Sequence, residues 1–168
     1  MGTKVTDAEL KEITQLKNLR VLDLGGTAIT DAGLKELSPL KHLAGLDLNS
    51  TNITNSGMKE LAALPSLAGL GLANTKVTDD GVKQIATLKN LTILELGGTK
   101  VTDSAMKELT ALKNLSEVDL NATKVTDVGL KELVALHKLT SLKLRGTEIT
   151  DAGVKELQNA LPNCKIEK

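Results

Sequence analysis

The sequence predicts an α/β fold made of short strand–turn–helix units stacked along one axis. The phrase Gly-Thr-Lys-Val-Thr-Asp, or a near-copy of it, occurs seven times at a constant spacing of 24 residues. Its first threonine is Thr3, Thr27, Thr51, Thr75, Thr99, Thr123 or Thr147. Apolar and polar residues alternate before each copy except the first, and apolar residues recur at helical spacing after each copy. This constant period predicts a solenoid, in which each unit buries its apolar face against its neighbours.

A short strand is expected at the start of each unit. In residues 19–42, Leu22, Asp23 and Leu24 alternate between apolar and polar, which is the pattern of a half-buried strand. Gly25 and Gly26 come next and indicate a turn. The equivalent apolar positions of the later units are Leu43/Leu46/Leu48, Leu67/Leu70/Leu72, Leu91/Leu94/Leu96, Leu115/Val118/Leu120 and Leu139/Leu142/Leu144.

A helix is expected after each turn. Leu34, Leu37 and Leu40 are spaced by three residues, as on one face of a helix. Thr30 is expected to cap the helix, and Asp31 to interact with its dipole and with Lys35 one turn later. Such a pair adds ~0.2–0.5 kcal/mol to a helix. The pair recurs as Asp7/Lys11, Asp79/Lys83, Asp103/Lys107, Asp127/Lys131 and Asp151/Lys155.

The pattern Leu19-x-x-Leu22-x-Leu24-x-x-Thr27-x-Ile29 resembles the leucine-rich repeat, L-x-x-L-x-L-x-x-N/C-x-L. The helical half of each unit is similar to the ribonuclease-inhibitor-like and cysteine-containing subclasses, but threonine replaces the family's Asn or Cys in every copy. The resemblance implies a right-handed horseshoe, with short parallel strands on the concave face and helices on the convex face. It covers essentially the whole chain and predicts one domain, residues 1–168, of about seven repeats.

The repeated threonine is expected to be a structural element of the turn. Thr27, Thr51, Thr75, Thr99 and Thr123 should be buried, with hydroxyls bonded to backbone groups of the turns above and below. An alternative is an ice-binding threonine array, which requires this column to face solvent. The position of Thr27 in a turn between Leu24 and Ile29 favours the structural interpretation.

Composition excludes several classes of partner and site. The 21 basic and 21 acidic residues cancel, so no global field favours nucleic acid or an anionic membrane surface. The single Cys164 excludes an internal disulfide framework, and no apolar stretch suits a signal peptide or a membrane span. These features slightly favour the cytoplasm. With only His42 and His137 and no phosphate-loop motif, we expect no catalytic residue, metal site or cofactor, and so no enzyme.

Function is therefore expected on the concave face. The residues that flank the central strand leucine form columns, and the middle one reads Asp23, Asp47, Gly71, Glu95, Asp119 and Lys143. Like charges on adjacent strands repel by roughly 1 kcal/mol in water, which suggests that they serve a partner. The predicted partner-binding residues are Asp23, Asp47, Asn49, Glu95, Glu117, Asp119, Asn121, Lys143 and Arg145. A basic protein segment is the expected partner, bound through Asp47, Glu95 and Asp119, with a small basic patch at Lys143 and Arg145.

Two hypotheses for the function follow. The first is a non-enzymatic protein-interaction module that uses the concave face. The second is a spacer or scaffold segment of a longer protein, whose role is its length. In that case the charges of the concave face serve only solubility, by keeping a short parallel sheet from associating with others, and the absence of the Trp and Tyr that usually anchor tight interfaces favours this interpretation of the charges.

The two ends of the repeat array are expected to differ. Residues 158–168 break the period and predict a capping segment in which Leu161, Cys164 and Ile166 cover the last repeat. At the N-terminus, Val5, Leu10, Ile13 and Leu16 are expected to have one uncovered side, which Glu9 caps only partly. Either a preceding repeat or a second copy of the chain is the expected cover, and the second case predicts self-association.

Overall fold

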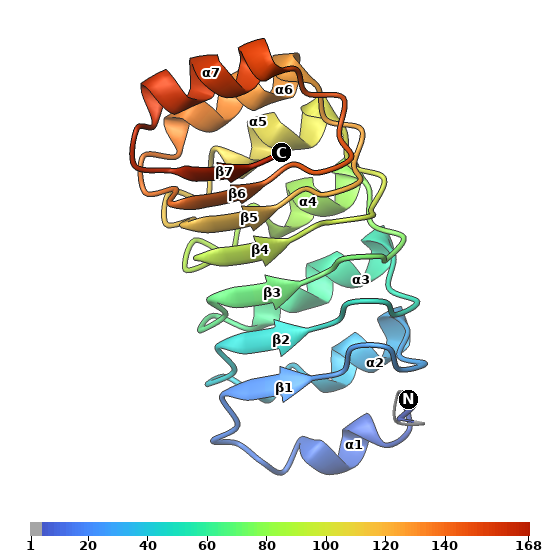
Figure 1. Ribbon diagram of the computed structural model, residues 1–168. Coiled ribbons are helices and arrows are strands. Elements are labelled where there is room, and N and C mark those ends of the chain that lie inside the picture. Colours follow the sequence, from blue (N-terminus) through green and yellow to red (C-terminus); the bar gives the residue numbers. More distant parts are fainter. Residues whose placement is uncertain (1–4) are drawn as a thin grey trace.

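The computed structural model describes residues 5–168. They form one open parallel sheet, and the helices lie on one side of it (Figure 1). The strands of this part of the chain follow one another in sequence order, so each pairs with the preceding and the following repeat. Each strand is three residues long: β1 (Val21–Asp23), β2 (Gly45–Asp47), β3 (Gly69–Gly71), β4 (Ile93–Glu95), β5 (Glu117–Asp119), β6 (Ser141–Lys143) and β7 (Lys165–Glu167).

The helices are short. Two of them continue directly into 3-10 segments, Lys59–Ala63 and Leu133–Ala135. Packing against neighbouring repeats therefore stabilises them more than helix propensity does. Their bounds are α1 (Leu10–Ile13), α2 (Asp31–Glu36), α3 (Asn55–Met58), α4 (Asp79–Ile85), α5 (Asp103–Leu109), α6 (Asp127–Glu132) and α7 (Asp151–Ala160).

Strand register turns the sequence period into columns of side chains. Leu22 pairs with Leu46, and Leu46 with Leu70, so equivalent residues lie side by side on neighbouring strands. The central side chains of β2 to β6 are buried in one continuous aliphatic core. Among the described residues, no buried side-chain nitrogen or oxygen lacks a hydrogen-bond partner. The α/β solenoid predicted from the period is confirmed.

The predicted threonine column is buried. Thr27, Thr51, Thr75, Thr99 and Thr123 are only 4–7% exposed. The hydroxyl of Thr27 donates to the carbonyl oxygen of Leu24 at 2.6 Å, and the other four make the equivalent bond at 2.6–2.7 Å. The partner lies in the same repeat, not in the turns above and below, because the i−3 carbonyl is already within reach. A buried column cannot present hydroxyls to ice, so the ice-binding alternative is wrong.

A second polar column connects successive repeats. One carboxylate oxygen of Asp7 accepts the backbone N–H of Thr30 at 2.9 Å, and the other accepts its hydroxyl at 2.6 Å. The same pair of bonds joins Asp31 to Thr54, Asp79 to Thr102, Asp103 to Thr126 and Asp127 to Thr150. We call these contacts the Asp–Thr ladder. Through these contacts, the backbone N–H at the start of α2, α3, α5, α6 and α7 donates a charge-assisted hydrogen bond to the neighbouring repeat.

The ladder corrects the predicted role of the aspartates. None of the six Asp–Lys pairs expected within the helices has its charged atoms within 4.0 Å in residues 5–168. Five of these carboxylates accept N–H and O–H donors of the next repeat, which are fixed in place, instead of reaching a flexible solvated lysine, and the sixth, Asp151, contacts Lys168. The predicted N-cap is confirmed, since Thr30 accepts the N–H of Ala32.

Asn55 replaces aspartate at one step of the ladder. Its carbonyl oxygen accepts the N–H of Thr78 at 2.9 Å, and its amide donates to the Thr78 hydroxyl at 2.8 Å. Thr78 then makes no side-chain cap to its own helix, α4, unlike the equivalent threonines at the starts of α2, α3, α5, α6 and α7. This step keeps the contact between repeats without a charge.

The C-terminal end is closed. Leu161 and Cys164 are buried, as predicted, and residues 165–167 continue the sheet as β7, with Ile166 paired to Leu142. A seventh strand was not expected there, because the period breaks at Asn163. Burial raises the pKa of the Cys164 thiol.

The N-terminal end is more open. Leu16 is 55% exposed, and Val5 and Ile13 are partly buried, as expected. Leu10 is an exception to the prediction, since its own repeat and α2 cover it completely. Glu9 accepts the N–H of Thr6 at 2.8 Å and thereby occupies the role that a ladder aspartate has in the other repeats. These bonds to Thr6 lower the pKa of Glu9.

Candidate protein-binding face

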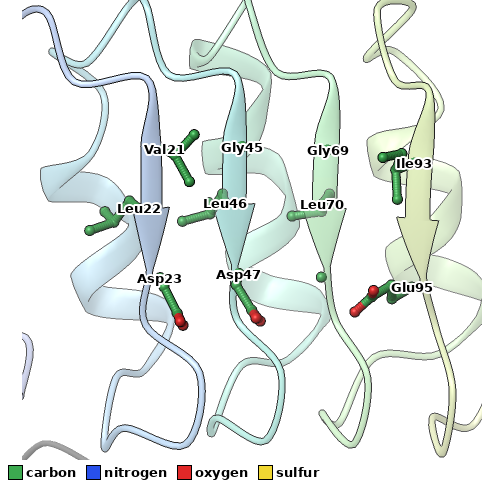
Figure 2. A pocket seen from close by; sticks show the side chains of 11 residues that line it. Val21, Leu22, Asp23, Gly45, Leu46, Asp47, Gly69, Leu70, Ile93 and Glu95 are labelled. Atoms are coloured by element: carbon green, nitrogen blue, oxygen red, sulfur yellow. The ribbon is translucent and has the colours of Figure 1, made fainter.

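The concave face of the sheet carries a shallow hollow over its first four strands (Figure 2). It has a volume of about 310 Å³. Its floor is Gly45, Gly69 and Gly71, and the side chains of Val21 and Ile93 stand on either side. Asp23, Asp47 and Glu95 lie along the carboxyl ends of the same strands. The hollow therefore combines an apolar part with an acidic edge.

The strand aspartates hold the turns that follow them. Asp23 accepts the N–H of Gly25 at 2.9 Å, and Asp47 accepts the N–H of Asn49 at 2.7 Å. On β5, Asp119 makes the same bond to Asn121 at 2.9 Å. One carboxylate oxygen thus shapes the turn, and the second is left for other contacts.

Asn49 connects three repeats. Its side-chain oxygen accepts the N–H of Ala73 at 2.6 Å, and its amide donates to Glu95 at 2.7 Å, two strands away. A Cβ at Gly71, between them, would lie 2.9 Å from side-chain atoms of Asn49 and Asp47. The missing side chain at Gly71 is therefore what allows Asn49 to reach Glu95.

Charges on the C-terminal strands are paired with one another. Lys143 lies 3.4 Å from Asp119, and Arg145 lies 3.8 Å from Glu167. Lys165 also contacts Glu167 at 2.6 Å, and this contact is the main cause that lowers the pKa of Glu167. Lys143 and Arg145 thus face carboxylates instead of forming a free basic patch.

The remaining predicted residues lie on the same face. Glu117 is exposed on β5, beside Ile93 on β4 and Ser141 on β6. Asn121 accepts the N–H of Arg145 at 2.7 Å and so stabilises the backbone of the next repeat. The structure brings all nine predicted residues to the concave face and its turn edge, and their contact with a partner stays a prediction.

The carboxylates of the hollow differ from those farther along. In the part of the chain that the structure describes, Asp23, Asp47 and Glu95 have no Lys, Arg or His nitrogen within 4.0 Å. Asp23 and Asp47 occupy paired positions of β1 and β2, so their charges lie on neighbouring strands, as predicted. The negative charge that is free to meet a partner therefore gathers over β1 to β4.

Groups suited to other chemistry are sparse in the described chain. No three His, Cys, Asp or Glu side chains in residues 5–168 gather where they could hold a metal ion. His42 and His137 are exposed, and the thiol of Cys164 is buried with a raised pKa, which disfavours the reactive thiolate. No helix in this range has the length and apolar character needed to cross a bilayer.

The family follows from the match of the whole repeat array. A family profile described as "Leucine-rich repeat region" matches residues 3–167. The chain belongs to the leucine-rich repeat family. No curated protein matches it significantly. The ribonuclease-inhibitor-like or cysteine-containing subclass stays a prediction.

Three solved structures show where this leucine-rich repeat fold recurs. Internalin C2 of Listeria monocytogenes is 25% identical, with a TM-score of 0.72 over 99% of this chain and 76% of the internalin. A second internalin of that organism, inlF, is 22% identical, with a TM-score of 0.67 over 94% of this chain and 50% of its own. A leucine-rich repeat protein of Leptospira interrogans is 24% identical, with a TM-score of 0.57 and coverage of 94% and 51%.

The chain thus spans about half the length of two of these proteins. Leucine-rich repeat proteins of this kind are typically non-enzymatic binding modules, which agrees with the general class predicted from the sequence.

Proposed function

We propose that the protein is an interaction module whose concave face receives a basic segment of a partner protein. The observation that carries this proposal is the row of three carboxylates, Asp23, Asp47 and Glu95, which have no cationic partner within residues 5–168. Asp23 and Asp47 lie on adjacent strands at a spacing of about 4.8 Å, where like charges repel. A cationic segment would relieve this repulsion.

The C-terminal strands contribute less to this binding. Asp119 already has Lys143 within 3.4 Å, so a partner would have to displace that lysine before it could use the carboxylate. We still expect Asp119 to bind the partner together with Asp47 and Glu95, but we expect its contribution to be smaller than theirs. Because Asp119 and Lys143 are both partly exposed to solvent, removing this ion pair should change the binding free energy little.

A spacer function remains the alternative. The repeat-to-repeat ladder makes a continuous stack, which suits a rigid segment that separates other parts of a longer protein. A spacer has no use for an unpaired acidic row, and it predicts no selective binding to the concave face.

The test is binding of a fluorescent lysine-rich peptide across a salt series. The variant Asp23→Asn/Asp47→Asn/Glu95→Gln removes three charges but keeps the oxygen that accepts the turn N–H groups of Gly25 and Asn49. We expect it to bind about tenfold more weakly at low salt, with a smaller salt dependence.

The matched control is Asp119→Asn/Lys143→Gln, which removes one carboxylate and its paired cation and leaves the net charge unchanged. We expect it to bind the peptide like the wild type. Equal binding by the wild type and the triple variant, or no binding by either, would contradict the proposal and favour the spacer.

A further inference from the structure

Two glycines on the floor of the hollow are not required by the fold. A Cβ at Gly69 would have nothing within 4 Å, and one at Gly45 would touch only Val21, at 3.5 Å or more. Neither has the positive φ that excludes other residues. Gly71 is different, since the side chain of Asn49 fills the space above it. The space above Gly45 and Gly69 is therefore open, and the fold does not require glycine at either position.

Two apolar side chains border this space. Val21 is 69% exposed and Ile93 is 39% exposed, although both belong to strands of a folded sheet. Figure 2 shows them on β1 and β4, pointing toward each other across β2 and β3. Three strand spacings, roughly 14 Å, separate β1 from β4. The hollow of about 310 Å³ is at the lower limit for small-molecule pockets, and it suits one aliphatic side chain lying between the two walls.

The acidic row runs parallel to this apolar line. Asp23 lies two residues after Val21, and Glu95 two residues after Ile93, so the two lines are roughly 7 Å apart. In an extended peptide, successive side chains point to opposite sides. A peptide that lies across the strands can therefore place one side chain over the glycines while its neighbours point at the carboxylates.

We propose that the hollow binds a short extended segment of the form basic–aliphatic–basic, with a leucine-sized side chain over the floor between Gly45 and Gly69. The aliphatic side chain contacts Val21 and Ile93, and the flanking Lys or Arg residues face Asp47 and Glu95. Charge complementarity selects this occupant over an acidic or a purely apolar one. The inference rests on the proposed function and adds the residue type that a partner must carry at its centre.

The experiment compares three synthetic peptides against the full chain. They are acetyl-Lys-Lys-Leu-Lys-Lys-amide, the same peptide with Ala at the centre, and the leucine peptide with Glu in place of Lys. Binding is followed through the ¹³C-labelled methyl groups of Val21 and Ile93. We expect the leucine peptide to bind about tenfold more tightly than the alanine peptide and to shift both methyl signals, and we expect no binding of the Glu peptide.

Gly69→Leu fills the hollow from within at a position where the added Cβ has open space. We expect it to abolish the preference for leucine over alanine while basic peptides still bind. Ser141→Leu is the matched control, because Ser141 occupies the same column on β6, outside the hollow. It should leave the preference intact, and thermal melting verifies that both variants fold.

The outcomes separate the two proposals. If the wild type binds the leucine and alanine peptides equally, or if Gly69→Leu keeps the preference, the hollow is not the site and only the inference falls. If neither basic peptide binds, the proposed function falls together with the inference.

Discussion

The two halves of the concave face use similar residues for different purposes. Over β1 to β4, the carboxylates of Asp23, Asp47 and Glu95 have no Lys, Arg or His nitrogen of the described chain within 4.0 Å, and the floor is glycine. Over β5 to β7, Lys143 lies against Asp119 and Arg145 against Glu167. The comparison shows that a column of carboxylates is paired in one half of the face and unpaired in the other. The difference depends on whether the next strand supplies the counter-charge, as Lys143 does for Asp119.

The asparagines at the turn edge give the strongest contrast in stability between the halves. The side chain of Asn49 makes bonds to two other repeats, whereas the side chain of Asn121 makes its bond to Arg145. Asn49→Ala should cost about 1–3 kcal/mol of unfolding free energy, because it leaves the half-buried N–H of Ala73 unpaired. Asn121→Ala should cost less, since Arg145 is exposed to water. Urea unfolding of both variants measures this difference, and equal costs would contradict the assignment.

Glycine substitution tests the floor of the N-terminal half. Gly71→Ala should destabilise by about 1–3 kcal/mol, because its Cβ would crowd Asn49 and Asp47 at 2.9 Å. Gly69→Ala should be neutral or stabilise by ~0.4–1 kcal/mol through the unfolded chain. Urea midpoints with unchanged m-values give both numbers. If the two variants behaved alike, Gly71 would not hold the space for Asn49.

Each half also contains one end of the stack, and the ends predict different association. Leu16 is 55% exposed at the N-terminal end, whereas Leu161 is 6% exposed at the other. We expect the chain to self-associate through the N-terminal end, and Leu16→Lys to weaken this by about 10–100-fold. Light scattering over a concentration series measures the effect. Val128→Lys, on an exposed position of α6, serves as the control and should change nothing.

Acid should act on the C-terminal half through the ladder. Hydrogen bonds from Thr150 lower the pKa of Asp127, so its contribution to stability is present above the unfolded pKa of ~3.9 and is lost as pH falls through the folded value. The Asn55 step of the N-terminal half carries no such charge. Asp127→Asn should therefore make the melting temperature depend less on pH below about 4 than in the wild type. An unchanged pH profile would show that Asp127 is not a source of acid sensitivity.

The smallest expected effect is at the paired charges. Lys143→Gln should change the unfolding free energy by ~0–1 kcal/mol, because the contact with Asp119 is close to solvent. Its binding consequence is more informative. With Asp119 released, the variant should bind the lysine-rich peptide slightly more tightly than the wild type, as measured by fluorescence anisotropy. Weaker binding would mean that Lys143 itself contacts the peptide.

The sequence predicted the fold because its period is strict. The strand register, the buried leucines and the threonine column follow from a pattern in which a threonine equivalent to Thr27 occurs every 24 residues. The ladder could not be predicted in the same way. Asp31 has Lys35 one helical turn away in the sequence, and only the stacked structure shows that the N–H and hydroxyl of Thr54 are nearer.

The site was predictable to a smaller extent. The concave columns and the like charges of Asp23 and Asp47 could be read from the repeat, since register follows from the period. The contact from Asn49 to Glu95 skips a strand, so no rule about neighbouring repeats could find it. The pairing of Lys143 with Asp119 could have been predicted from the sequence, because the two opposite charges occupy the same column on adjacent strands.

The Asp–Thr ladder makes the repeats exchangeable. Successive repeats offer a threonine to the repeat before and an acceptor, aspartate or Asn55, to the repeat after. Removing 24 residues would therefore rejoin an acceptor to a threonine through the same kind of contact. The distance from Val21 to Ile93 can then change only in whole repeats, by about 4.8 Å each. Deleting residues 50–73 would bring Val21 and Ile93 one strand closer and remove Gly69 and Gly71 from the floor. The ladder thus accommodates a change in the number of repeats, and a change between β1 and β4 resizes the hollow by a fixed step.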